Sequence, residues 1–371
     1  MSNSKENKIP ILSFFSGGGF MDMGFEQAGF EVIWTNEFDK DFVELSRYGR
    51  EKWKKSLNQT DNCFVNQSSI SDLDTSELLI EAFGNKEIPP FGIIGGPPCQ
   101  DFSLNGKMRG FNGDRGKLTI DFVNKVKILD PIFFLIENVP GLIRNQSNKE
   151  YYFILLDELK SSYLIDMKIL NSLDFGVPQS RERLFTVGLK KNFFKDDGIS
   201  FKWPVSESNI RNPLKNLQWP RQNNFGEFLN KPEHIPIELC VASCLVDDTD
   251  FEKIPNSNEF FQLKTSIEKL SSIKEGETNR PSFKRLHRYR YSPTTCYGNN
   301  EVHLHPFKNR RISVREALRI QGVPDTYILK QSDSLSKKFK MIGNGVPVPL
   351  ARAIGNSIYE YILQNINVTA K

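Results

Sequence analysis

Short apolar runs alternate with longer amphipathic stretches over the first half of the chain. Four runs are apolar and are bounded by glycine, proline or polar residues, as buried strands are: Ile11–Phe15, Val32–Trp34, Gly92–Ile94 and Ile132–Ile136. Between the last two, Leu118, Phe122, Val126 and Leu129 recur at helical spacing. Strands that alternate with helices are typical of a mostly parallel sheet with helices on both faces, so we predict an α/β fold.

The pattern changes after about residue 200. Leu164–Leu170 and Leu184–Leu189 are expected to close the sheet as an antiparallel pair, whereas residues 201–305 are rich in Asn, Pro, Ser and charge. Helical spacing returns at Val314–Ile320 and Leu350–Ile362. We therefore expect a discontinuous catalytic domain, residues 1–200 and 331–371, and a smaller loop-rich domain, residues 201–330, that includes the returning helix.

Composition excludes some classes of protein. No apolar run approaches the roughly 20 residues of a membrane span. The five cysteines are odd in number and irregularly spaced, which favours a reducing cytoplasm over a disulfide framework. Cys240 with Cys244, or His303 and His305 with Cys296, match no zinc-site spacing, so we expect no metal. The net charge of +4 is too small to indicate nucleic acid by itself.

A glycine-rich turn follows the first predicted strand, and a carboxylate ends the second. Phe15–Gly19 (Phe-Ser-Gly-Gly-Gly) follows the first strand and precedes a helix-like stretch, and Glu37 ends the second strand about twenty residues later. Glycines permit a tight turn close to a ligand, and a carboxylate at this spacing can accept bonds from ribose hydroxyls. The pair alone predicts a nucleoside cofactor, NAD included.

A thiol and a carboxyl group are expected at the same edge of the sheet. Gly95-Gly96-Pro97-Pro98-Cys99-Gln100 follows the Gly92–Ile94 strand, and the two prolines stiffen the loop that carries Cys99. Glu137 lies at the end of the next strand. Ligands of open α/β folds bind at the carboxyl ends of the strands, so Cys99 and Glu137 are candidates for catalysis.

The chain resembles the cytosine-5 DNA methyltransferase family of the bacterial restriction-modification type over nearly its whole length. Seven ordered motifs carry the resemblance: Phe15–Gly19, Asn36–Asp39, Pro97–Gln100, Glu137–Val139, Gln179–Arg183, Arg311–Ala317 and Gly343–Val346. Phe20 stands where the family usually has another glycine, and Ser69 where it often has an aspartate. The resemblance implies a Rossmann-like S-adenosylmethionine-dependent methyltransferase fold with a target recognition domain.

The resemblance also implies a mechanism. Cys99 would add to carbon 6 of cytosine so that carbon 5 can accept a methyl group, and Glu137 would hold or donate a proton at ring nitrogen 3. Arg183 and Arg181 would bind the base carbonyl or a phosphate. The residues implied to bind S-adenosylmethionine are Phe15, Ser16, Gly17, Gly19, Glu37, Phe38, Ile70, Pro97, Asn344 and Val346.

Double-stranded DNA is the partner that the resemblance implies. A cytosine stacked in a duplex must be flipped out before it can reach a thiol. The glycine-rich, basic loop 105–117 and the basic-aromatic stretch 280–290 are suited to phosphates and base edges. The predicted DNA-binding residues are Gln100, Ser103, Lys107, Arg109, Arg115, Arg280, Lys284, Arg285, Arg288 and Arg290. We expect a monomer, with a separately encoded restriction endonuclease as its counterpart.

Four other interpretations fit the sequence less well. Amino-methyltransferases generally have an aromatic residue after Pro-Pro, whereas Cys99 stands here. An RNA-directed relative would use the same thiol, but the variable region of about a hundred residues favours a reader of duplex DNA. Intact Cys99, Glu137 and Arg183 argue against a catalytically silent DNA-binding protein. An NAD oxidoreductase leaves the Pro-Pro-Cys loop unexplained.

Overall fold

The computed structural model describes residues 8–98, 114–194, 201–206, 210–295, 297 and 301–366, with side chains left out at 114 and 115. Within these residues seven strands form one sheet in the order β3-β2-β1-β4-β5-β8-β6. The strands are β1 (Pro10–Phe14), β2 (Glu31–Asn36), β3 (Phe64–Asn66), β4 (Gly92–Gly95), β5 (Phe133–Asn138), β6 (Tyr163–Asn171) and β8 (Glu182–Lys190). The first five are parallel to one another, and β8 runs antiparallel to both β5 and β6.

Helices cover both faces of the sheet because neighbouring residues of each strand point to opposite faces. On one face lie α1 (Phe20–Gln27) and α11 (Val348–Asn365), whose apolar residues share a core with Ile11 and Phe133. On the other face lie α3 (Thr75–Phe83), α4 (Asp114–Leu129) and α6 (Gln146–Asp157), which share a core with Leu12 and Phe134. The predicted α/β architecture with a mostly parallel sheet is therefore confirmed.

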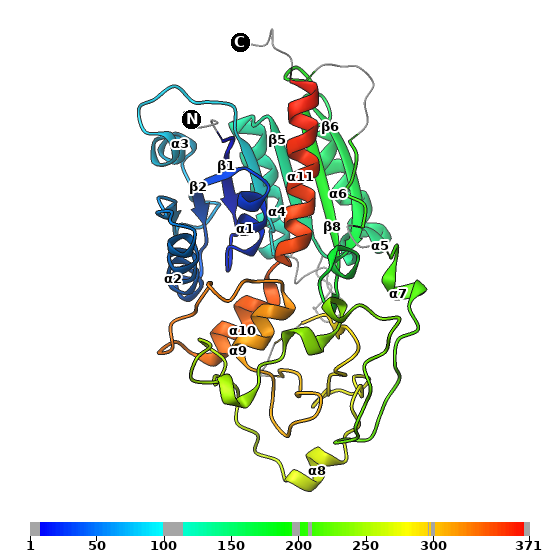
Figure 1. Cartoon of the computed structure of the whole chain (residues 1–371). Helices are drawn as coiled ribbons and strands as arrows, with labels where there is room; N and C mark the ends of the chain where they lie inside the picture. Colours follow the sequence, from blue (N-terminus) through cyan, green and yellow to red (C-terminus); the bar gives the residue numbers. More distant parts are fainter. Residues whose placement is uncertain are drawn as a thin grey trace, which may run out of the picture.

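A second, loop-rich part lies below the sheet in Figure 1. Its described elements are short: α7 (Pro213–Asn216), α8 (Ile267–Ser271), β9 (Ser292–Pro293) and three single 3₁₀ turns, Ile237–Leu239, Val241–Cys244 and Asp248–Asp250. Strand β9 pairs with β7 (Gln179–Ser180), which directly precedes β8. The remaining short elements, α5 (Gly141–Arg144) and the 3₁₀ turn Ser172–Phe175, belong to the upper part. The expectation of irregular structure in this region is confirmed for its described residues.

A third core joins the two parts. It contains apolar residues of α1, α2 (Lys40–Ser56), α9 (Val314–Ile320) and α10 (Leu335–Asn344), together with Val241, Leu286 and Val302 of the loop-rich part. Residues 310–329, assigned from sequence to the smaller domain, thus pack against helices of the larger one. Figure 1 shows α9 and α10 between the sheet and the loops.

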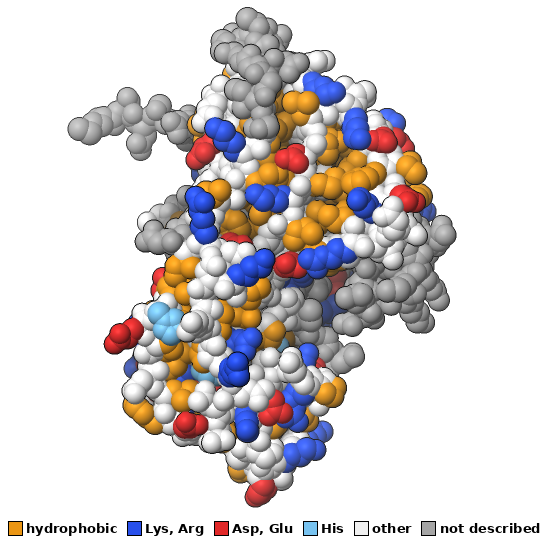
Figure 2. Space-filling model, turned by 90° about the vertical axis from the view of Figure 1, so that its right-hand side faces the viewer, with side chains coloured by type: hydrophobic (Ala, Val, Ile, Leu, Met, Phe, Trp, Pro, Cys, Tyr) orange, Lys and Arg blue, Asp and Glu red, His pale blue; other side chains and the backbone are white. Residues whose placement is uncertain are grey.

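The predicted strands agree with the structure to within one or two residues, and the antiparallel pair β6–β8 is confirmed. Helix α4 contains all four positions of the predicted periodicity, and α9 and α11 lie where helical spacing returns. On the face drawn in Figure 2, Lys and Arg side chains are scattered over both parts with carboxylates between them. None of the helices in the described ranges is long and apolar enough to cross a membrane.

Helices α1 and α11 pack closely at Gly24. A Cβ atom added there would lie 2.5 Å from the Ala351 Cβ and 2.7 Å from the Arg352 backbone nitrogen. Alanine normally stabilises a helix by up to about 1 kcal/mol relative to glycine, but overpacking costs about 1–3 kcal/mol. We predict that Gly24→Ala lowers the free energy of unfolding, measured by urea denaturation. Gln27→Ala, on the exposed side of the same helix, is the control. A Gly24→Ala protein as stable as the unsubstituted chain would show that this contact is loose.

Candidate active site

Four parallel strands end at one level of the sheet. Phe14 of β1 is in register with Asn36 of β2 and with Gly95 of β4, and Gly95 is in register with Ile136 of β5. Directly beyond these four positions lie the residues that sequence analysis selected: the glycine-rich turn, Glu37, the Pro-Pro loop and, within the last two residues of β5, Glu137. The sheet therefore brings the sequence motifs to a common edge.

The glycine-rich turn is closed by the Glu37 carboxylate. Phe15, Gly17 and Gly19 all have positive φ angles, 54°, 54° and 69°. The backbone N–H of Gly17 donates to Glu37 Oε2 at 2.8 Å, and the N–H of Asp39 donates to Oε1 at 2.8 Å. Burial raises the pKa of Glu37, and these hydrogen bonds oppose the rise. Above Gly17 the space is open, because an added Cβ would meet only the Phe15 carbonyl oxygen, at 4.0 Å.

Buried polar residues support this turn from below. Ser13 Oγ donates to Asp22 Oδ1 at 2.6 Å, and Arg50 lies 3.7 Å from the other oxygen of Asp22 and 3.0 Å from Asp61. Burial raises the pKa of Asp22 to about 6, against the attraction of Arg50. From the far side, Tyr327 Oη donates to the Gly18 carbonyl at 2.8 Å. Sequence analysis missed Tyr327, because 309 positions separate it from Gly18.

The remaining residues assigned to the cofactor have contrasting environments. The Phe38 ring is 70% exposed, whereas Ile70 and Val346 are buried. Ser16 is half-buried, Pro97 is buried, and Asn344 is exposed at the end of α10. The variant residue Phe20 points into the third core, where its ring packs edge-on against Tyr327 with centroids 5.6 Å apart.

A carboxylate, a partly buried Phe-Gly turn and an exposed aromatic ring fit the parts of a nucleoside cofactor. Glu37 has the acceptor oxygens that vicinal ribose hydroxyls require, and Phe38 offers a free ring face to a purine. The open space above Gly17 leaves room for such a molecule to approach the backbone. The carboxylate, the aromatic ring and the open space thus fit a nucleoside cofactor.

Glu137 forms an ion pair with Arg183 across two neighbouring strands. Arg183 Nε lies 3.0 Å from Glu137 Oε1, and 13% of each side chain is exposed. Strand β8 places Arg183 there, since Leu184 is in register with Asn138. Burial raises the pKa of Glu137, while Arg183 and Arg181 lower it. A carboxyl group in this setting can keep a proton at higher pH than a solvent-exposed glutamate.

Gly96 leaves the room that the Glu137 carboxylate occupies. An added Cβ at Gly96 would lie 2.9 Å from Glu137 Oε2. Gly96 is followed by Pro97 and Pro98, and Pro98 is the last described residue before Cys99. Cys99 itself lies outside the described residues, as do Gln100, Ser103, Lys107 and Arg109, and the Arg115 side chain is not described either.

A buried network ties the segment before Arg183 to the returning chain. Arg181 is 1% exposed, and its Nη2 donates to the Asn344 carbonyl at 3.3 Å. Gln179 Nε2 donates to Gln321 Oε1 at 3.0 Å, and Gln179 Oε1 accepts from the Thr295 N–H at 3.1 Å. Gln179 was quoted in a motif, but its partner Gln321 was not selected from sequence.

The basic residues of the loop-rich part fall into two groups. Arg285 has no exposed surface and donates to the carbonyls of His305, Lys308 and Leu270 and to Asn309 Oδ1, at 2.8–3.1 Å. This burial argues against the expectation that Arg285 contacts DNA. Its four acceptors make it a cross-link between loops.

Arg288 and Arg280 are also engaged within the chain. Arg288 makes a bidentate pair with the fully buried Glu275, at 2.9 and 2.8 Å. Arg280 pairs with Glu277 at 2.7 Å and is partly exposed. Among the described residues, the Arg290 side chain hydrogen-bonds only to the hydroxyl of Tyr291, at 3.2 Å, and Lys284 is half-buried.

The chain matches a known protein family and curated relatives over nearly its whole length. A family profile described as C-5 cytosine-specific DNA methylase matches residues 9–360. The chain is 37% identical to Type II methyltransferase M.NmeDI of Neisseria meningitidis serogroup C, covering 96% of this chain and 85% of the relative. It is 32% identical to Type II methyltransferase M.FnuDI of Fusobacterium nucleatum, covering 95% and 94%.

Solved structures give the same fold. A protein described as a DNA modification methyltransferase encoded within an E. coli prophage superimposes with a TM-score of 0.66 at 24% identity, over 96% of this chain and 100% of that one. The S. pombe Dnmt2 methyltransferase superimposes with a TM-score of 0.60 at 15% identity, over 96% and 99%. The methyltransferase fold predicted from the resemblance is confirmed.

Proposed function

The chain belongs to the C-5 cytosine-specific DNA methylase family, and from this premise we propose that it methylates a flipped-out cytosine within one specific double-stranded DNA sequence, with S-adenosylmethionine as methyl donor and Cys99 as nucleophile. The observation that carries the proposal is the Glu137–Arg183 ion pair, whose atoms lie 3.0 Å apart. The Glu137 carboxylate lies against Gly96, and Gly96 precedes Cys99 by three positions in the sequence. Because its relatives are named Type II methyltransferases, we further propose that its methylation protects DNA from cleavage by a cognate restriction endonuclease.

The proposed chemistry begins with the thiol. Cys99, as thiolate, adds to carbon 6 of the cytosine ring, and the displaced electron pair makes carbon 5 nucleophilic. Glu137 donates a proton to ring nitrogen 3 and thereby neutralises the charge that the addition creates. When bound, S-adenosylmethionine supplies the electrophilic methyl group for carbon 5. Loss of the carbon 5 proton to a base then restores the double bond and expels Cys99.

The electrostatic setting supports these roles. Burial raises the pKa of Glu137, which favours the protonated carboxyl that donation to nitrogen 3 requires. Arg183 lies beside that carboxyl, so its guanidinium can bind the neighbouring base carbonyl when Glu137 engages the ring. Phe15, Gly17 and Glu37 would hold the nucleoside cofactor, with Phe38 and Ile70 against the adenine.

We propose that residues 1–200 and 331–371 form the catalytic domain and that residues 201–330 recognise the target sequence. The sheet, with the cofactor turn and the Glu137–Arg183 pair, lies in the first set, and the second consists mainly of loops in its described residues. Loops are suited to variable recognition because their side chains can change without altering the sheet.

The covalent step has a direct test. Duplex DNA with 5-fluorocytosine at the target, incubated with protein and S-adenosylmethionine, is expected to give a denaturant-resistant complex, because fluorine cannot leave as a proton. Cys99→Ala should abolish the complex, seen by denaturing electrophoresis. Cys63→Ala is the control, because burial raises the pKa of that thiol to about 12. Persistence of the complex in the Cys99→Ala protein would assign the nucleophile elsewhere.

Glu137→Gln preserves the size of the side chain but removes the acidic proton of the carboxyl group. Loss of a positioned acid is expected to lower the single-turnover methylation rate by roughly 10²–10⁴-fold, with cofactor affinity nearly unchanged. Glu150→Gln, an exposed position of α6, serves as control. A normal rate in the Glu137→Gln protein would mean that the proton comes from another group.

Glu37→Ala tests the cofactor site. Removing a charged acceptor costs about 1.5–3 kcal/mol, so calorimetry should show S-adenosylmethionine binding weakened roughly ten- to hundredfold. Glu37→Gln keeps one acceptor oxygen, so its affinity for S-adenosylmethionine should lie between those of the Glu37→Ala and unsubstituted proteins. Glu31→Ala, at the opposite end of β2, should bind normally. Equal affinity of the Glu37→Ala and unsubstituted proteins would place the ribose against other residues.

A further inference from the structure

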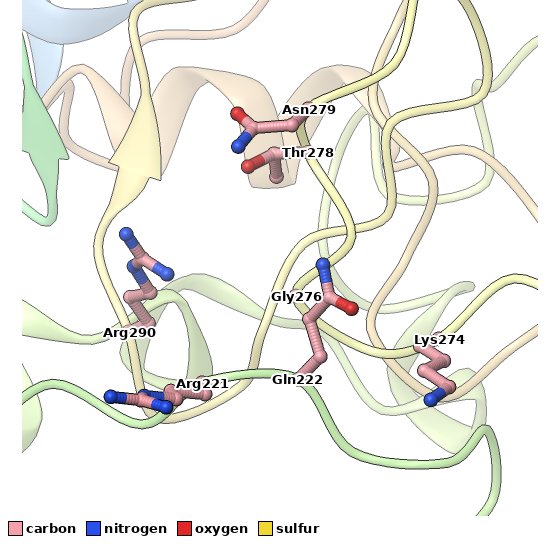
Figure 3. Close-up of a pocket in the computed structure, with 7 residues that line it drawn as sticks. All are labelled: Arg221, Gln222, Lys274, Gly276, Thr278, Asn279 and Arg290. Carbon is pink, nitrogen blue, oxygen red and sulfur yellow. The ribbon is translucent and has the colours of Figure 1, made fainter.

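A polar hollow of about 480 Å³ opens in the loop-rich part of the molecule. Three cationic residues, Arg221, Lys274 and Arg290, and three neutral polar ones, Gln222, Thr278 and Asn279, line it (Figure 3). In Figure 3 the side chains of Gln222, Asn279 and Arg290 project toward the space between their segments, whereas Lys274 lies at its margin. Only Arg290 of these six was selected from sequence.

The walls of the hollow are joined by backbone hydrogen bonds. Asn223 and Glu275 exchange N–H···O bonds of 3.1 and 2.9 Å, and the Gly276 N–H donates to the Leu286 carbonyl at 3.1 Å. Gly276 has a φ of +86°, and a Cβ there would lie 2.8 Å from the Arg221 carbonyl oxygen. The segment that contains Arg221 and the segment that contains Gly276 therefore meet at a position that suits only glycine. The lining residues therefore stand on a rigid frame.

The frame also neutralises the nearby acids. The buried carboxylate of Glu275 accepts from the side chain and the backbone N–H of Arg288, and Glu277 pairs with Arg280. Among the described residues, Arg221 and Lys274 make no ion pair within the chain, and the amides of Gln222 and Asn279 make no side-chain hydrogen bond. All four are exposed. The hollow thus presents positive charge and free amide groups to a ligand.

We infer that this hollow determines the DNA sequence specificity, with Gln222, Asn279 and Arg290 contacting base edges in the major groove and Lys274 contacting a phosphate. The inference rests on the proposed function. Asn and Gln amides match the donor and acceptor of adenine, and the arginine fork matches the two acceptors of guanine. A lysine at the margin supplies a point charge, which suits the backbone rather than a base. Arg285 and Arg288 instead form the frame beneath these residues.

The experiment uses the full-length protein and a library of duplexes with randomised positions around one cytosine, sequenced after bisulfite treatment. Gln222→Ala, Asn279→Ala and Arg290→Ala should each reduce discrimination at one base pair by roughly five- to hundredfold. Lys274→Ala should weaken methylation of all sequences alike and lower the salt-dependence slope by about one. Gln364→Ala on α11 and Lys168→Ala on β6, both exposed and remote from the loops, are matched controls.

The outcomes separate the inference from the proposed function. If the unsubstituted protein produces no 5-methylcytosine in any library sequence, the proposed function fails. If it methylates one sequence context and all three base-contact variants keep that preference, the specificity lies outside the hollow and the inference is wrong. A uniform loss in every variant, with a lower salt slope, would also overturn it, because phosphate binding alone would explain the result. Gln222→Ala and Asn279→Ala remove exposed side chains that make no hydrogen bond within the described part of the chain, so thermal melting should show both variants folded.

Discussion

The first and last helices of the described chain pack against each other at Gly24, and the arrangement of the rest depends on this contact. The chain leaves the sheet after β8, forms the loop-rich part and returns through α10 to α11. Because α11 then lies on the same face of the sheet as α1, both ends of the loop-rich part are attached to one rigid body (Figure 1). The hydrogen bonds of Gln179 with Gln321, and of Tyr327 with Gly18, add cross-links at the same junction. A loop-rich part attached at both ends keeps a defined position relative to the carboxyl edge of the sheet.

Two glutamates at that edge show how the surroundings place one residue type in two different electrostatic settings. Burial raises the pKa of both Glu37 and Glu137. Glu37 is held by two backbone N–H groups, which orient both of its oxygens within the glycine-rich turn. Glu137 instead faces guanidinium groups, which can exchange their carboxylate partner for a substrate oxygen. The first arrangement suits a fixed acceptor, and the second suits a group that gains and loses a proton.

The arginines of residues 280–290 illustrate the same division in the loop-rich part. A guanidinium removed from water is tolerated only where acceptors replace the lost hydration, and Arg285 finds four of them while Arg288 finds the buried Glu275. These residues link loops that contain few apolar side chains. Arg290, with one neutral partner, keeps most of its donors available. Basic residues that look equivalent in the sequence therefore differ in their capacity to bind DNA.

Apart from Arg183, which the resemblance of its motif selected, the amino-acid sequence by itself determined the alternation of strands and helices, the antiparallel pair and the selection of Glu37 and Glu137. It could do so because these features depend on local periodicity and on the rule that parallel strands end at a common edge. Only the tertiary structure decided that Glu137 pairs with Arg183, that Tyr327 reaches Gly18, and that Arg221 and Gln222 join Asn279 and Arg290 around one hollow. These contacts join residues tens to hundreds of positions apart, and their geometry depends on how loops and helices pack in three dimensions, which no local pattern records.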